Sequence, residues 1–259
     1  VVEDPLLNEY IQDLGNKLSS KVQDGDFQFN YFFVPQNSIN AFAMPGGYIG
    51  IHNGLCLAAD NESQLASVVA HEISHVTQRH ISRQIGDQVP NSIQGGLILL
   101  GAILLGAISG NSEIVEAGAM VAPSVMTQNQ IDFTRDMEIE ADAIGIKTLG
   151  LSGYDPYAMS EFFEKLSTGS DPRNAQSIEF LRTHPTSVNR SAAAKKQARR
   201  MTVDRKDESL GFELSKARIR HLFSITPEKS YEYFLEKANQ DRLSDNLSNH
   251  QIGNLYGLA

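Results

Sequence analysis

The segment His71-Glu72-Ile73-Ser74-His75 constrains the fold of this chain more than any other. Its two histidines are four residues apart, so on a helix they share one face, and both imidazoles can reach one zinc ion. Glu72 lies beside them, where its carboxylate can accept a proton from the attacking water without binding the metal. The pattern therefore predicts a helix carrying a zinc-binding pair and a general base; the alternative is two surface histidines.

A catalytic zinc ion needs a third protein ligand and one open position. The best source is the acidic segment 137–142, in which Glu138 and Asp142 are four residues apart and share a helix face. One of them can bind the metal while the other accepts a hydrogen bond from a ligand histidine. Glu140 is rotated about 200° from Glu138 on a helix. Spacing favours Glu138 as the ligand and leaves Glu140 and Asp142 as alternatives.

His184 opens the sequence HPTSVNR, which ends at Arg190. A histidine before proline is by itself more typical of a structural residue. Beside a zinc site, however, His184 and Arg190 become candidates to stabilise the oxyanion of a tetrahedral intermediate. The other histidines show no such grouping, and His80 is expected off the site because it lies about 140° around a helix from His75.

The pattern of apolar residues predicts a mostly helical chain with a few short strands. Asp4 and Pro5 are typical of a helix start, and Pro45-Gly46-Gly47 is typical of a hairpin turn. The hairpin indicates a sheet edge near the metal, where Tyr48 and Ile49 could bind an extended peptide; a plain structural hairpin is the alternative. Helices are expected at about 5–22, 60–85, 131–149, 156–166, 186–201 and within 209–259, and strands at 27–34 and within 39–52.

Residues 93–108 are nearly all apolar but are interrupted by glycines. The run is shorter than the roughly 18–20 residues that a membrane-spanning helix needs. We expect 93–130 to form a buried helical hairpin or a cover over the active site. The alternative is a surface that dips into a membrane or meets a partner.

Composition narrows the class of protein. The net charge of −9 and the lack of a Lys/Arg block exclude a typical nucleic-acid binder. The single cysteine, Cys56, excludes an internal disulfide and a cysteine-based metal site. No targeting segment can be read at Val1. We expect one domain over 1–201, a polar linker at 202–208 and C-terminal helices over 209–259.

Five segments occur in one order: NAFA at 40–43, GGYI at 46–49, the block 61–80, MEIEAD at 137–142 and HPTSVNR at 184–190. Together they resemble the HtpX and CAAX-prenyl-protease family of zinc metallopeptidases, and most nearly its members in the Gram-negative periplasm. The likeness covers residues 1 to about 200 and is looser beyond about 205. It implies an α+β, mostly helical, zincin-type metalloprotease domain with a small antiparallel sheet and an H-E-x-x-H active-site helix.

The resemblance also implies roles for single residues. Glu138 matches the family's third zinc ligand, and Asp142 matches an aspartate that lies behind the ligands. Asn40 matches an asparagine that contacts the substrate backbone. His184 matches a histidine that assists the transition state, and that in periplasmic members can instead bind the zinc and hold the enzyme latent.

The expected protein is a zinc-dependent periplasmic endopeptidase with one Zn²⁺ ion. The resemblance implies that it degrades misfolded or stalled outer-membrane β-barrel precursors, with the barrel assembly machinery as a partner and possible peripheral membrane contact. Residues 249–259 resemble the first helix of a tetratricopeptide repeat. The alternative is a non-proteolytic assembly or chaperone factor with a structural zinc site, closed by His184 as fourth ligand.

Overall fold

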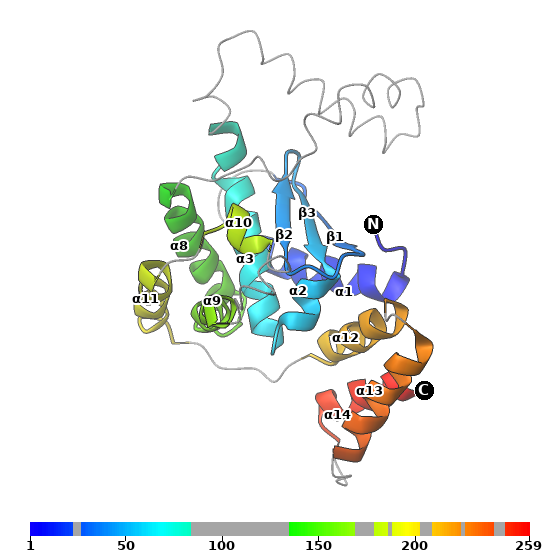
Figure 1. The fold of residues 1–259 in the computed structure, drawn as a ribbon. Coiled ribbons are helices and arrows are strands. Elements are labelled where there is room, and N and C mark those ends of the chain that lie inside the picture. Colours follow the sequence, from blue (N-terminus) through cyan, green and yellow to red (C-terminus); the bar gives the residue numbers. More distant parts are fainter. Residues whose placement is uncertain are drawn as a thin grey trace, which may run out of the picture.

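The computed structural model describes residues 1–22, 27–83, 135–168, 179–185, 188–202, 209–223, 226–240 and 247–259 (Figure 1). The apolar segment 93–130 and most of the predicted linker lie outside these residues. In chain order the elements are α1 (Pro5–Ser19), β1 (Asn30–Val34), β2 (Ala41–Met44), β3 (Tyr48–His52), α2 (Asn53–Ala58), α3 (Glu62–Thr77), α8 (Arg135–Leu151), α9 (Ala158–Thr168), α10 (Phe180–Thr183), α11 (Val188–Ala198), α12 (Leu210–Leu222), α13 (Pro227–Gln240) and α14 (Asn249–Leu258).

The first helix begins where the sequence predicts. The Asp4 carboxylate accepts a hydrogen bond from the Leu7 amide at 3.1 Å, and Pro5 occupies the first helical position. Both features favour helix initiation. Proline has no amide hydrogen to leave unpaired, and the carboxylate accepts a hydrogen bond from an amide of the first turn that has no partner within the helix. α1 buries its apolar face against β1 and α3.

The sheet has three strands in the order β1-β3-β2, so β3 is the central strand. β3 runs antiparallel to β2 but parallel to β1, and the predicted all-antiparallel sheet is therefore wrong. The alternation of apolar residues predicts that strands exist, but it does not say which strands pair. The chain passes from β1 to the far side of the sheet, forms β2 there, and returns through the hairpin to insert β3 between them.

The hairpin needs its glycines. Gly46 and Gly47 have φ values of 88° and 82°, a region that residues with a side chain rarely adopt. A Cβ atom on Gly47 would also lie 2.1 Å from the Gln28 carbonyl oxygen. The predicted turn at this position is confirmed. It joins the outer strand β2 to the central strand β3.

Helix α3 runs through the middle of the molecule, surrounded by the sheet, α1, α8 and α9 (Figure 1). The Asn61 side chain accepts a hydrogen bond from the Gln64 amide at 2.9 Å and begins the helix at the predicted place. The helix ends at Thr77, earlier than predicted, because Arg79 adopts a left-handed conformation with φ 54°. The chain direction changes at this residue.

Helices α3 and α8 approach closely at Gly145. A Cβ atom there would lie 3.2 Å from the His71 amide nitrogen and 3.1 Å from the Met159 methyl group. The absence of a side chain thus lets α8 contact the backbone of α3 beside His71. This contact fixes the distance between the two helices.

We expect Gly145→Val to lower the free energy of unfolding by about 1–3 kcal/mol, because the added atoms have no space between the helices. The same change should weaken metal binding, since Glu138 is carried by α8. Urea unfolding of the metal-free protein measures the first effect. Ala143→Val, at an exposed position of the same helix, is the matched control and should change the unfolding free energy little.

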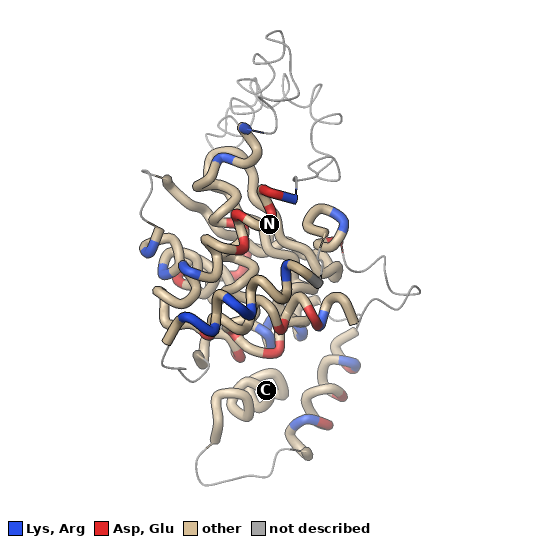
Figure 2. The backbone as a smooth tube through the Cα atoms, turned by 90° about the vertical axis from the view of Figure 1, so that its left-hand side faces the viewer, with Lys and Arg blue, Asp and Glu red and all other residues tan. Residues whose placement is uncertain are grey.

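The C-terminal helices are not all separate from the core. Phe212 and Ile219 of α12 are fully buried in the main hydrophobic core, where α12 packs on α1 and α2. α13 and α14 pack on each other and on α12. α13 carries three glutamates and two lysines, and acidic and basic residues are mixed in the same way over much of the chain (Figure 2). Within the described residues, no helix combines the length and the apolar character that a membrane span requires.

Candidate metal centre

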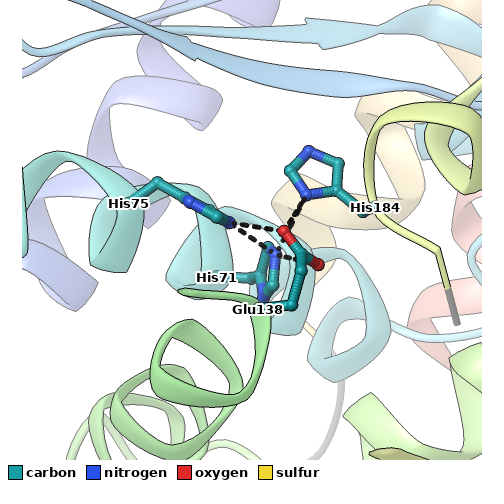
Figure 3. A group of neighbouring side chains, drawn as sticks. All are labelled: His71, His75, Glu138 and His184. Atoms are coloured by element: carbon teal, nitrogen blue, oxygen red, sulfur yellow. Dashed lines mark hydrogen bonds and ion pairs between the residues drawn. The ribbon is translucent and has the colours of Figure 1, made fainter. Parts of the chain in front are cut away.

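Three elements bring four side chains to one point (Figure 3). His71 and His75 come from α3, Glu138 from the first turn of α8, and His184 from the end of α10. Each offers one potential ligand atom, and these atoms all lie within 4.8 Å of one another. All four side chains are buried.

The local structure positions His184 firmly. Its amide donates a hydrogen bond to the Phe180 carbonyl at 2.8 Å, and its ring stacks on the Phe180 ring with the centroids 4.6 Å apart. The Phe180 amide in turn donates to the Ile39 carbonyl at 3.0 Å. The segment that carries His184 is therefore attached to the chain just before β2.

The donor set fits zinc. The His75 Nε2 atom lies 2.9 Å from His71 Nε2 and 3.3 Å from Glu138 Oε1. The His184 Nδ1 atom lies 2.9 Å from the same carboxylate oxygen and 3.3 Å from His71 Nε2. Three imidazole nitrogens and one carboxylate oxygen that converge in a buried space form the ligand set that Zn²⁺ prefers.

The charges in the centre depend on one another. Burial raises the pKa of Glu138, but His184 and His75 outweigh it, and the pKa lies far below its usual value. Burial lowers the pKa of His184, but Glu72 and Glu138 outweigh it and raise the pKa above its usual value. Burial holds the pKa of His75 well below its usual value. An ionised Glu138 and a neutral His75 are the forms that bind a metal.

Arg190 and Asp142 support the centre from behind. The Arg190 guanidinium donates to both Asp142 oxygens at 2.7 and 2.8 Å, and its Nη1 atom lies 2.7 Å from Glu138 Oε2. The same atom donates to the Pro185 carbonyl at 2.8 Å. Asp142 Oδ1 lies 3.0 Å from His71 Nδ1, which is the place predicted for a residue that orients a ligand histidine. Arg190 therefore contacts both carboxylates, and its role as an oxyanion donor stays a prediction.

Glu72 lies on α3 beside the ligands and is fully buried. Its Oε1 atom lies 3.5 Å from His184 Nε2, and the Ala43 amide is close enough to lower its pKa, although neither oxygen makes a hydrogen bond of normal geometry among the described residues. Burial raises the pKa of Glu72, while His184 and His71 oppose the rise. A buried carboxylate with a raised pKa is suited to receive a proton from water or substrate.

His80 is a residue that the sequence analysis placed wrongly. It was expected off the site, but it is fully buried, and its Nδ1 atom lies 2.9 Å from His75 Nδ1. The expectation assumed an unbroken helix, and the left-handed Arg79 turns the chain so that His80 lies against His75. His80 Nε2 lies 3.1 Å from Glu140 Oε2. Glu140, an alternative ligand by spacing, thus faces His80.

The predicted peptide-binding edge also needs a correction. Tyr48 and Ile49 lie on β3, which has a neighbour on both sides, and Ile49 is fully buried. The outer strand on the α3 side is β2. Asn40 precedes β2, is buried, and donates a hydrogen bond to Glu179 at 3.4 Å. Its proposed contact with substrate is not tested by this geometry.

The main-chain groups on the free side of β2 follow from its pairing. The His52 amide donates to the Asn40 carbonyl, so even-numbered residues of this strand bond to β3. The alternation then directs the N–H and C=O groups of Ala41 and Ala43 away from β3. The Ala43 amide faces Glu72, whose pKa it lowers, and the other groups form the edge that could pair with an extended chain.

A helix bearing H-E-x-x-H, with a glutamate supplied by a second helix, is typical of zinc-dependent metallopeptidases. Comparison with known proteins agrees: the chain belongs to peptidase family M48, whose sequence profile matches residues 5–198.

Relatives share this region and continue beyond it. The chain is 40% identical to the putative β-barrel assembly-enhancing protease of Vibrio cholerae over 85% of this chain and 45% of that protein. It is 40% identical to the β-barrel assembly-enhancing protease of Escherichia coli K12, over 86% of this chain and 45% of that protein. The β-barrel assembly-enhancing protease of Yersinia pestis is 36% identical, over 100% of this chain and 52% of that protein. The chain thus spans about half the length of the curated relatives it matches.

Proposed function

We propose that this chain is the peptidase part of a zinc-dependent endopeptidase that degrades misfolded or stalled outer-membrane β-barrel proteins in the periplasm. The observation that carries the proposal is the convergence of His71, His75 and Glu138 beside the fully buried carboxylate of Glu72. The substrate class comes from the names of the relatives. The periplasmic location, a contact with the barrel assembly machinery and peripheral membrane contact are parts of the same proposal.

The chemistry divides among few residues. His71, His75 and Glu138 would hold the zinc ion, which when bound supplies a Lewis acid for peptide hydrolysis. Glu72 accepts the proton of the attacking water and delivers it to the leaving amine. Burial raises its pKa, which favours uptake of the proton.

The substrate binds as an added strand. An extended polypeptide pairs with the main-chain groups of Ala41 and Ala43 on the free side of β2, and Asn40 lies at the start of this edge. Main-chain pairing depends little on side chains, so it suits unfolded polypeptides of varied sequence. This edge replaces Tyr48 and Ile49 as the expected binding strand.

His184 has two arrangements in this proposal. In the described arrangement it lies among the three ligands and could complete a tetrahedral site, which excludes substrate and keeps the enzyme latent. Directed away from the metal, it could stabilise the oxyanion of the tetrahedral intermediate. The two roles exclude each other at any moment.

One observation favours a different class of protein. A site closed by four protein ligands is typical of structural zinc, so the chain could be a non-proteolytic assembly or chaperone factor. The fully buried Glu72 carboxylate argues against this, since burying a charge costs free energy and a structural zinc site has no use for a carboxylate that is not a ligand.

His184→Ala distinguishes the alternatives, measured as casein hydrolysis by the zinc-loaded protein. If the latent form makes up about nine-tenths of the molecules and the oxyanion contact adds little to the rate, the substitution raises the rate about tenfold. A slower variant would instead assign His184 to the oxyanion. A variant that loses zinc and stability, with neither form cleaving casein, would favour the structural site. His221→Ala, at an exposed histidine of α12, is the matched control.

A further inference from the structure

The two ligand histidines of α3 are held from behind by different partners. His71 faces a carboxylate, Asp142, at 3.0 Å. His75 faces another histidine: its Nδ1 atom lies 2.9 Å from Nδ1 of His80. His80 continues to Glu140, whose Oε2 atom lies 3.1 Å from His80 Nε2. Arg83 Nη1 lies 2.8 Å from the same Glu140 oxygen.

The order of the protons along this chain follows from its outer end. The Glu140 Oε2 atom accepts a hydrogen bond from the Arg83 guanidinium at 2.8 Å, and a carboxylate paired with arginine offers His80 only an acceptor. His80 Nε2 must then carry a hydrogen. In a neutral imidazole the other nitrogen has a lone pair, so His80 Nδ1 accepts. His75 Nδ1 must donate to it.

This order prepares His75 for the metal. A neutral His75 with its hydrogen on Nδ1 has the lone pair on Nε2, and Nε2 is the atom that lies 3.3 Å from Glu138 Oε1. The buried His80 also fixes the plane of the His75 ring, since the two ring centroids are 4.8 Å apart in an edge-on contact. Ring plane and tautomer are the two properties that outer partners of ligand histidines control.

The geometry points to a positioning role for His80: together with Glu140, it holds His75 in the tautomer and ring orientation that bind zinc. This inference rests on the proposed function, because it takes His75 as a zinc ligand. It assigns to His80 a role that the spacing in the sequence argued against, and it makes Glu140 part of the site without making it a ligand. The left-handed Arg79 is what brings His80 into place.

Nitrogen NMR of the histidine rings tests the order of protons in the wild-type protein, without any substitution. We expect His80 to carry its hydrogen on Nε2 and His75 on Nδ1 in the zinc-loaded protein, where His75 Nε2 is the proposed ligand atom. A scalar coupling between the two Nδ1 nuclei, transmitted through the hydrogen bond, should also be visible. A His80 ring with its hydrogen on Nδ1, or two rings without the coupling, would overturn the inference.

Two substitutions of His80 test the effect on the metal. His80→Leu removes the acceptor and should weaken zinc affinity by about 10–100-fold, the usual range for an outer partner of a ligand histidine. His80→Asn places an amide oxygen close to the position of Nδ1 and can accept the same hydrogen bond, so its affinity should stay within about threefold of wild type. Competition with a chromogenic chelator measures both.

Comparison of the two variants separates a positioning role of His80 from a purely structural role. If His80→Leu and His80→Asn lose zinc affinity equally, or neither loses it, the positioning role is wrong. His221→Asn on the exposed face of α12 should have no effect. A wild-type protein that binds no zinc at all would contradict the proposed function, whereas equal zinc affinities of the two His80 variants, in a protein that binds zinc, would contradict only the inference about His80.

Discussion

Glu72→Gln is expected to leave zinc bound and to reduce casein hydrolysis by about 10²–10⁴-fold, the usual contribution of a positioned general base. The amide of glutamine has nearly the shape of the carboxylate but cannot accept the proton of the attacking water. The ligands His71, His75 and Glu138 remain, so the bound metal should be unchanged. Casein hydrolysis and elemental analysis of the same sample measure both quantities. Undiminished hydrolysis would refute the role of Glu72.

The same substitution has a stability effect of known sign. Burial raises the pKa of Glu72 in the folded protein above the usual 4.5. A group with a raised folded pKa stabilises the fold below its unfolded pKa, and this stabilisation is lost as the pH rises through the folded pKa. The metal-free variant should therefore gain unfolding free energy relative to wild type as the pH rises above about 4.5. A gain that grows as the pH falls would contradict this assignment.

The sequence predicted the parts of the site that depend on local geometry. The spacing of His71 and His75 determines that they share a face of α3, and the cap at Asn61 determines where that helix begins. Glu138 and Asp142 occupy one face of α8 for the same reason, and the structure directs Glu138 to the histidines and Asp142 to His71. Such relations need only the period of a helix.

The parts of the site that the sequence did not predict depend on a break in a helix or on the pairing of strands. One residue with φ 54° turns His80 back to His75, and nothing in a helical wheel indicates such a residue. Similarly, the order β1-β3-β2 depends on which side of β1 the chain passes. That crossing moved the candidate substrate edge from Tyr48 and Ile49 to the outer strand β2. Periodicity carries no information on either event.

Arg190→Met is expected to lower the free energy of unfolding of the metal-free protein by about 3–5 kcal/mol, the usual result of removing one partner of a buried ion pair. Arg190 is buried and contacts Asp142 through two hydrogen bonds and Glu138 through Nη1. Without it, two buried carboxylates lose their countercharge. Urea unfolding at neutral pH measures the effect. Arg218→Met, which removes a more exposed partner of Asp4, is the control and should change stability by at most about 1 kcal/mol.

Two further variants separate the role of Arg190 as a support from the predicted role as an oxyanion donor. Adding Asp142→Asn to Arg190→Met removes one of the stranded charges, so the double variant should recover part of the lost stability. Arg190→Lys keeps the charge but not the paired hydrogen bonds, and should fall between wild type and Arg190→Met. An oxyanion donor would behave differently: Arg190→Lys would lose casein hydrolysis while the unfolding free energy and zinc content stayed at wild-type values. That combination would restore the oxyanion role and contradict the role assigned from the two carboxylate contacts.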